Sequence, residues 1–448
     1  MTATLTYDEA LASLAQFLNS QAPPGVPYDL EHRNPGTFGE FLHTLGAPHE
    51  AFPCVHIAGS KGKGSTAVML ASILSQAGLR TGLFTQPHLV TVRERAQIDR
   101  QLIRPEEFAA LVAELQAHVA TAGYAQPARM RTFFERLTAL SFLHFARHQV
   151  DCAVIEVGLG GRLDATNVLT PRVAVITPIG LEHTRLLGPT LAAIAREKAG
   201  IIKPHACVVS AVQAPEVVEV LEQRCQEQQA TLWLAGRDFE WQVVESMYHG
   251  TCMHFHGGGL HLTDLHVSLL GRHQAANAAV ALAVIAQLRR QRWSVGENHM
   301  RQGLATVQWE GRLELLSRKP WVVLDAAFTV ESAQCLRQAL DELFDYQRLR
   351  LVLGLSSDKN IAAIVDILAP LAHEVIVTPF SNPRACDPQL LAAEVSRHHI
   401  PVRLAPDPVS AFDLARHPSE SADLICVAGS LFLLGELKAR WQGLPLEF

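Results

Sequence analysis

A glycine-rich stretch with a central lysine carries the residues best suited to chemistry. It reads CVHIAGSKGKGST over residues 54–66, where an apolar strand leads into a helix that we expect to begin near Ser65. Glycine allows the backbone to turn sharply and approach a ligand closely, and the amides of such a turn bind anions. The stretch therefore predicts a nucleotide phosphate site made of Ser60, Lys61, Gly62, Lys63, Gly64 and Ser65.

The spacing of this stretch differs from the general phosphate-loop pattern. That pattern is G-x-x-x-x-G-K-[ST], whereas this chain has G-x-x-G-K-G-S, with Gly64 between Lys63 and the hydroxyl residues. The alternative interpretation is an ordinary glycine-rich turn with one solvated lysine. Because a strand pattern precedes the glycines and a helix pattern follows them, phosphate binding is favoured.

Polar residues also follow other strand-like runs of the sequence. Gln86 follows TGLFT, Glu156 ends DCAVIE, and His183 follows RVAVITPIGLE. Strands that alternate with helices indicate a parallel sheet covered by helices on both faces. Ligands of such sheets bind outside the carboxyl ends of the strands. We therefore expect these three side chains to converge on the phosphate loop.

Composition excludes several classes of protein. The 448 residues suffice for two or three domains, and 48% apolar with 18% charged residues is an ordinary globular balance. A net charge of −6 argues against a non-specific nucleic-acid binder. The sequence has neither a run of about 18 apolar residues nor a signal peptide, so we expect no membrane span. Eight scattered cysteines without a C-x-x-C pair predict free thiols in a cytoplasmic protein.

The predicted fold class is α/β with two domains. Residues 1–304 would form a large P-loop domain, with a mostly parallel sheet flanked by helices and a small antiparallel insertion at about 231–270. Residues 305–448 would form a smaller Rossmann-like α/β domain. The insertion contains His254, His256, His261 and His266, whose period of about two favours strands over a metal site.

Nine stretches together resemble the folylpolyglutamate synthase/dihydrofolate synthase family of the Mur-ligase superfamily. The resemblance runs from about residue 30 to residue 440, and the stretches come in the family's order. They are HIAGSKGKGST, TQPHL, TFFERLTAL, IEVGLGGRLDATN, IGLEHT, AREKAGIIKP, LLGRHQAANA, EGRLEL and AGSLFLLGE. One such stretch alone would be a weak sign, but nine in order are highly specific.

The resemblance implies an ATP- and Mg²⁺-dependent ligase. It would add L-glutamate to dihydropteroate, to folate γ-carboxylates, or to both, through an acyl-phosphate intermediate. Its partners would be small molecules, namely a pterin or folate, L-glutamate and ATP, and the protein would act as a monomer. Positioning and charge neutralisation supply most of the catalysis in phosphoryl transfer.

The resemblance also implies roles for individual residues. Lys63, Lys198 and His183 would be catalytic, with Lys198 carbamylated, and Glu156, His183 and Gln86 would hold magnesium. Glu156 is flanked by apolar residues and glycines, and a carboxylate there needs a cation. ATP would also contact Asn277, Arg312 and Asp325. The pterin would contact Thr132, Phe133, Phe134, Glu135, Leu163, Asp164 and Ala165, although the two phenylalanines could equally belong to a helix core.

Two positions depart from the family pattern. Gln86 stands where the family has a serine, and its carbonyl is also a hard oxygen ligand. Phe328 stands where the family has a histidine at the ATP and glutamate site, and phenylalanine cannot donate a hydrogen bond. Three alternatives stay open: the usual ligase, the same chemistry on a different acid or amine, and a weakened nucleotide- or folate-binding protein.

Overall fold

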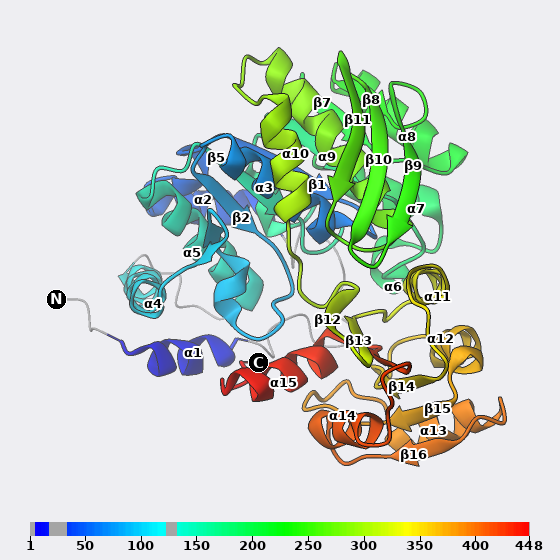
Figure 1. The fold of residues 1–448 in the computed structure, drawn as a ribbon. Coiled ribbons are helices and arrows are strands. Elements are labelled where there is room, and N and C mark those ends of the chain that lie inside the picture. Colours follow the sequence, from blue (N-terminus) through cyan, green and yellow to red (C-terminus); the bar gives the residue numbers. More distant parts are fainter. Residues whose placement is uncertain (1–4, 18–33, 122–131, 448) are drawn as a thin grey trace.

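The computed structural model describes residues 5–17, 34–121 and 132–447. Two α/β units follow one another along the chain, one built on an eight-stranded sheet and the other on a six-stranded sheet (Figure 1). A three-stranded antiparallel sheet lies beside the larger unit. The predicted fold class is therefore confirmed.

The strand that leads into the phosphate loop lies inside the larger sheet. The strand order is β4-β3-β2-β5-β1-β6-β7-β8. All neighbours pair in parallel except at β3 and β4, which form a hairpin antiparallel to β2. The strands are β1 (Cys54–Ala58), β2 (Thr81–Phe84), β3 (Gln97–Ile98), β4 (Gln101–Leu102), β5 (Cys152–Glu156), β6 (Val173–Ile176), β7 (Cys207–Ser210) and β8 (Thr231–Leu234).

Helices cover both faces of this sheet, as the alternation of strands and helices predicts. The cluster on one face contains α3 (Lys63–Gln76), α9 (Arg272–Arg290) and α10 (Glu297–Thr306). The other face and its edge carry α1 (Tyr7–Ala15), α2 (Pro35–Thr44), α4 (Pro105–Thr121), α5 (Phe133–Arg147), α6 (Thr184–Leu187), α7 (Leu191–Ala199) and α8 (Pro215–Glu227). No helix in the described parts of the chain is long and apolar enough to cross a membrane.

The antiparallel insertion is shorter than predicted. It consists of β9 (Phe239–Met247), β10 (Gly250–Gly257) and β11 (Leu260–Val267). The prediction was wrong for Thr231–Leu234, because α8 returns the chain to the sheet edge and β8 pairs in parallel with β7. Within the insertion, Met253 and Phe255 face the helical core, whereas His254 and His256 lie on the more exposed side.

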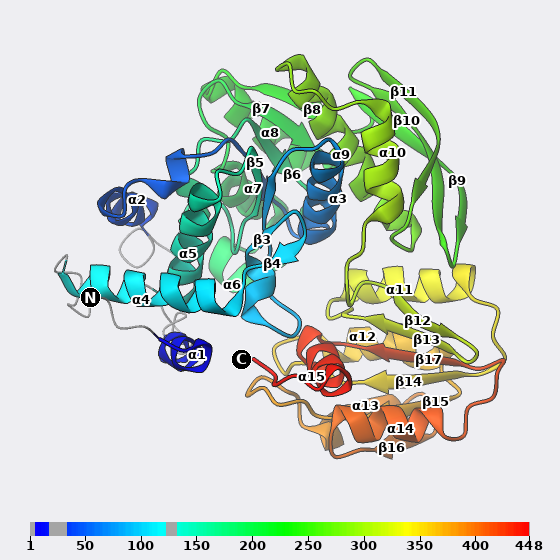
Figure 2. The ribbon, with the colours of Figure 1, turned by 60° about the vertical axis from the view of Figure 1, so that its left-hand side comes forward.

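The smaller unit places helices on both sides of its sheet (Figure 2). Its order is β12-β13-β17-β14-β15-β16, parallel except for β12. Its strands are β12 (Glu314–Arg318), β13 (Trp321–Asp325), β14 (Leu349–Leu353), β15 (Glu374–Val377), β16 (Val402–Leu404) and β17 (Leu424–Ala428). Its helices are α11 (Val330–Leu343), α12 (Ile361–Leu368), α13 (Pro388–Ser396), α14 (Pro408–Arg416) and α15 (Leu431–Gln442). A domain boundary near residue 305 stays a prediction.

The two units are joined by an apolar contact and by the end of the chain. Leu89 and Val90, from the loop after β2, are buried in a core cluster of the smaller unit. The Glu447 carboxylate accepts hydrogen bonds from the Tyr7 hydroxyl at 2.9 Å and from the Val92 amide at 2.8 Å. Residues near both ends of the chain therefore hold the loop after β2 between the units.

The eight cysteines are free thiols, as predicted, and five of them are buried. Burial raises the pKa of Cys54 to about 12 and that of Cys225 to about 11. Because the thiolate is the reactive form of cysteine, these buried thiols are unreactive near neutral pH.

A glycine in α10 allows close packing against α3, and this contact can be tested. A Cβ atom at Gly303 would lie 2.6 Å from the Cα of Ile73. We expect Gly303→Ala to force the helices apart and to lower the free energy of unfolding by about 1–3 kcal/mol in urea denaturation. The matched control is Gly39→Ala in α2, where the nearest atom would be 3.7 Å away. That change should stabilise the protein by about 0.5–1 kcal/mol, because alanine favours helix. Equal effects of the two substitutions would contradict the packing argument.

Candidate active site

The phosphate loop has the geometry of an anion site. Gly62 adopts a left-handed backbone conformation with φ of 79°, and α3 begins at Lys63, two residues earlier than predicted. The amides of Ser60 and Lys61 are already bonded to the carbonyl of Pro178. The amides at the start of a helix have no partner within it. The amides that begin α3, from Gly62 onward, are therefore the ones open to an anion, and their role in phosphate binding stays a prediction.

Each glycine of the loop lies close to a neighbour, and at Gly59 and Gly62 that neighbour leaves no space for a side chain. A Cβ atom at Gly59 would lie 1.8 Å from the Thr177 hydroxyl, and one at Gly62 would lie 2.3 Å from the Asn277 amide oxygen. At Gly64 the nearest atom would belong to Trp309, at 3.2 Å. Asn277 thus lies against the loop, and its contact with ATP stays a prediction. Trp309 was missed by sequence reasoning, since an isolated tryptophan carries no motif.

Two lysine amines meet at one carbonyl of the loop. Lys198 donates to the Gly59 carbonyl oxygen at 2.7 Å, and Lys63 donates to the same oxygen at 3.2 Å. Lys198 is only 5% exposed, and burial, with Lys63 adding repulsion, lowers its pKa to about 7. A substantial fraction of Lys198 is therefore neutral at physiological pH.

A carboxylate that sequence reasoning missed balances part of this positive charge. Glu182 Oε1 lies 3.4 Å from the Lys61 amine and 4.0 Å from His183 Nε2. Burial raises the pKa of Glu182, but Lys61 and Lys63 outweigh that effect and the net pKa is lowered. His183 is 47% exposed, and desolvation lowers its pKa. The motif IGLEHT contained the signal, because it places an acid directly before the histidine.

Glu156 and Gln86 meet on the other side of the loop. The Glu156 carboxylate lies 4.0 Å from the Lys63 amine and accepts a hydrogen bond from the Gln86 backbone amide at 3.2 Å. Burial raises the pKa of Glu156, opposed mainly by Lys63. The Gln86 side-chain nitrogen is buried, and no partner bonds it among the described residues. Gln86 and Glu156 therefore lie together beside the loop, as expected. His183 instead contacts Glu182, which in turn lies near Lys61 of the loop.

The smaller unit brings a second pair of charges toward the loop. The Asp325 carboxylate at the end of β13 accepts the Leu313 amide at 2.8 Å. Burial raises the pKa of Asp325 to about 6, and Arg312 opposes this shift. Desolvation of the partly buried Arg312 lowers its pKa, while the charges of Asp325 and Glu156 raise it. Arg312 of the smaller unit and Glu156 of the larger unit therefore attract each other at the candidate site.

Phe328 touches cations from both units. The Lys61 amine of the phosphate loop lies 5.8 Å from the centre of the Phe328 ring, and the Lys359 amine lies 5.4 Å from it. An ammonium over an aromatic face is attracted by the ring quadrupole. The ring therefore draws a cation of the larger unit toward the smaller one. Lys359 was missed, because nothing in the DKN segment marks it.

Comparison with known proteins identifies the family. Residues 57–285 match the Mur ligase middle domain, and residues 311–431 match the glutamate ligase domain of Mur ligases. A dihydrofolate synthase/folylpolyglutamate synthase of Bacillus subtilis is 32% identical over 426 residues, which cover 90% of this chain and 94% of that protein. The chain belongs to the folylpolyglutamate synthase/dihydrofolate synthase family.

Solved structures agree with this chain over nearly its whole length. Mycobacterium tuberculosis folylpolyglutamate synthase complexed with ADP has a TM-score of 0.86 at 33% identity, covering 97% of this chain and 98% of that one. Escherichia coli FolC in complex with DHPP and ADP has a TM-score of 0.85 at 28% identity, covering 98% and 99%. This member of the folylpolyglutamate synthase family is therefore an ATP-dependent ligase.

The residues predicted to contact a pterin divide into two groups in this ligase. Thr132 and Glu135 cap the start of α5, because each side chain bonds the other's backbone amide. Phe133 is buried in the core of the larger unit, as are Leu163 and Ala165. Helix capping and core packing are sufficient structural reasons for these residue types. Their roles in substrate binding stay predictions.

Phe134 and Asp164 lie beside Gln86, a predicted magnesium ligand. A Cβ atom at Gly158 would come within 2.8 Å of Phe134, within 2.9 Å of Asp164 and within 2.9 Å of the Gln86 amide. Asp164 caps the 3₁₀ helix η5 (Ala165–Val168), and burial raises its pKa. The three side chains therefore surround one glycine just beyond the end of β5.

The shifted pKa of Lys198 gives the ligase a testable pH dependence. The unfolded chain holds this proton up to about pH 10.4, whereas the folded protein releases it at about pH 7. Between these values the unfolded state binds more protons, so Lys198 makes stability rise with pH, by at most about 1.4 kcal/mol per pH unit. We expect Lys198→Met to remove this rise when urea unfolding is compared at pH 7, 8 and 9. Substitution of the exposed Lys319 by methionine should preserve it. An unchanged slope in Lys198→Met would contradict the assignment.

Proposed function

We propose that this chain adds L-glutamate to dihydropteroate, to folate γ-carboxylates, or to both, using ATP. The observation that carries the proposal is the arrangement of charges around the phosphate loop. Lys63 and the first amides of α3 lie on one side, and Arg312 with Asp325 approaches from the other unit. The names of the similar proteins, dihydrofolate synthase/folylpolyglutamate synthase, support the choice of substrates.

The proposed reaction has two steps. A carboxylate oxygen of the pterin or folate substrate attacks the γ-phosphorus of ATP, which gives an acyl phosphate and releases ADP. The glutamate amine then attacks the acyl carbon, so that a C–N bond forms, the C–O bond to phosphate breaks, and the amine loses a proton. Lys63 and the loop amides neutralise charge on the phosphates. Closure of the two units would exclude water from the acyl phosphate.

The residues beside the loop fit a magnesium ion. Glu156 supplies a buried carboxylate; burial raises its pKa, and a cation beside it would favour the ionised form. The Gln86 side-chain amide is buried beside it without a hydrogen-bond partner for its nitrogen among the described residues, and its oxygen is a hard ligand. When bound, Mg²⁺ would neutralise the phosphate oxygens of ATP. His183 is the third proposed ligand.

Lys198 is the proposed carbamylation site. A neutral amine attacks carbon dioxide, which forms an N–C bond and releases a proton. The pKa of about 7 supplies that neutral amine near physiological pH. The carbamate would place a negative charge beside Lys63, with which Lys198 shares the Gly59 carbonyl. Phe134 and Asp164 remain the best placed of the proposed pterin contacts.

The proposed function is tested by product formation. Purified protein is incubated with ATP, Mg²⁺, L-glutamate and either dihydropteroate or tetrahydrofolate, and products are separated by mass. We expect glutamate to be added to at least one acid, with one phosphate released per bond formed. Lys63→Met is the matched control, and it should fold normally yet lose most of the turnover. Folded protein that binds ADP but uses neither acid would exclude the proposal.

Phe328 favours a second candidate, namely the same chemistry with a different acid or amine. Its ring is engaged by Lys61 and Lys359, and it offers no hydrogen-bond donor to a substrate. A screen of amino acids and pterin acids for ATP-dependent phosphate release separates the two candidates. Activity confined to glutamate with dihydropteroate or folates would remove the second one.

The contacts of Phe328 predict a graded effect on the ligase reaction. Loss of the ring would free Lys61 and Lys359, and cation–π attractions of about 0.5–2 kcal/mol correspond to a roughly twofold to thirtyfold effect. We expect Phe328→Leu to lower kcat/KM for ATP within that range, whereas Phe328→Tyr, which preserves the aromatic face, should stay close to the parent. Leucine and tyrosine variants with equal activity would show that the ring's apolar volume, and not its cation–π contacts, matters.

A further inference from the structure

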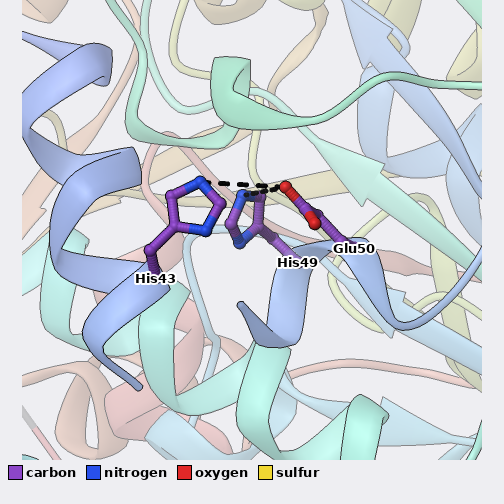
Figure 3. A group of neighbouring side chains, drawn as sticks. All are labelled: His43, His49 and Glu50. Atoms are coloured by element: carbon purple, nitrogen blue, oxygen red, sulfur yellow. Dashed lines mark ion pairs between the residues drawn. The ribbon is translucent and has the colours of Figure 1, made fainter. Parts of the chain in front are cut away.

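Two histidines and a glutamate converge at the end of α2, outside the candidate active site. His43 comes from α2, and His49 and Glu50 come from the short 3₁₀ helix η2 (Pro48–Glu50). The Nε2 atoms of His43 and His49 lie 3.8 Å and 3.7 Å from the same oxygen of Glu50. Figure 3 shows the three side chains turned toward one another. Three potential metal ligands thus face a common point.

A tight turn fixes the spacing of these ligands. The helix α2 ends at Thr44, and the amide of Ala47 bonds back to the carbonyl of Leu42 at 2.9 Å. Ala47 has a positive φ of 52°, and the Glu50 amide bonds to its carbonyl at 3.0 Å. The three ligands therefore come from one short segment whose backbone is held by its own hydrogen bonds.

His49 lacks the partners that a buried imidazole normally has. The residue is only 7% exposed, and its Nδ1 atom is buried with no hydrogen-bond partner among the described residues. Its Nε2 atom is 3.7 Å from Glu50, which is beyond hydrogen-bond length. Neither ring nitrogen of His49 therefore has a hydrogen-bond partner among the described residues.

We propose that His43, His49 and Glu50 bind a divalent transition-metal ion of the zinc class. Imidazole nitrogens with one carboxylate are ligands typical of Zn²⁺, and water would complete a tetrahedron. With metal–ligand bonds of about 2.0–2.2 Å, the ligand atoms of a tetrahedral site are roughly 3.3 Å apart. The observed separations are slightly wider, and rotation of the exposed His43 and Glu50 side chains closes the difference. The ion would fasten α2 to η2.

A second cluster provides a contrast. His144 of α5 and His148, which follows α5, lie beside Glu107 of α4, and each donates a hydrogen bond to the same Glu107 oxygen at 2.7 Å. These contacts are true hydrogen bonds, and they are shorter than the spacing of ligands around a tetrahedral metal. The polar atoms of this cluster therefore satisfy one another, whereas those at His43, His49 and Glu50 do not.

The proposal is tested by zinc titration of the full-length chain. Chelator-treated protein is titrated with ZnCl₂ in a calorimeter, with excess Mg²⁺ and ADP present to occupy the candidate active site. We expect one saturable zinc site per chain and a melting temperature that rises with zinc. His43→Ala and Glu50→Ala should each weaken zinc binding by roughly tenfold or more, as expected for loss of a ligand. Both side chains are exposed, at 59% and 63%, so neither change threatens the fold.

The matched control is His148→Ala, which removes a histidine from the contrasting cluster. It should bind zinc with the affinity of the parent protein. Parent protein without a saturable zinc site would overturn the proposal. Unchanged binding by the His43 and Glu50 variants would overturn it as well, and loss of binding only in His148→Ala would place the metal at Glu107 instead.

Discussion

Three lysine amines crowd the turn between β1 and α3, and the candidate site depends on how their charge is balanced. Lys63 and Lys198 share one backbone carbonyl, and Lys61 lies across the turn. Two largely buried carboxylates, Glu156 and Glu182, face them from the ends of neighbouring chain segments. Burial favours neutral forms while the opposite charges favour ionised ones. An anionic ligand such as a nucleotide phosphate would relieve the remaining repulsion among the amines.

The sheet makes this concentration of charge possible. Because β1 lies between β5 and β6, the loops that follow these strands meet at one edge. Thr177, Asn277 and Trp309 then press against the glycines of the phosphate loop from different elements. Larger side chains at those glycines would displace the loop from its neighbours. The sequence of the loop is thus constrained by packing as well as by the ligand that it would hold.

The smaller unit completes the surroundings of the loop through a few specific contacts. Leu89 and Val90 carry the loop after β2 into its core, and Glu447 holds the same loop from the end of the chain. Phe328 lies near Lys61 of the phosphate loop and Lys359 of the smaller unit, with amine-to-ring distances of 5.8 Å and 5.4 Å. The ring attracts both cations and offers no hydrogen-bond donor.

The sequence alone determined the fold class, the phosphate loop and the family, because periodicity, glycine spacing and the order of the motifs are local properties. It also predicted that Gln86 and Glu156 would meet, since parallel strands end at one edge of a sheet. Only the tertiary structure decided that Thr231–Leu234 joins the parallel sheet, because strand partners depend on where a helix returns the chain. Only tertiary contacts revealed the roles of Glu182 and Lys359, and the low pKa of Lys198. Burial and charge proximity arise from residues far apart in sequence, so no local pattern encodes them.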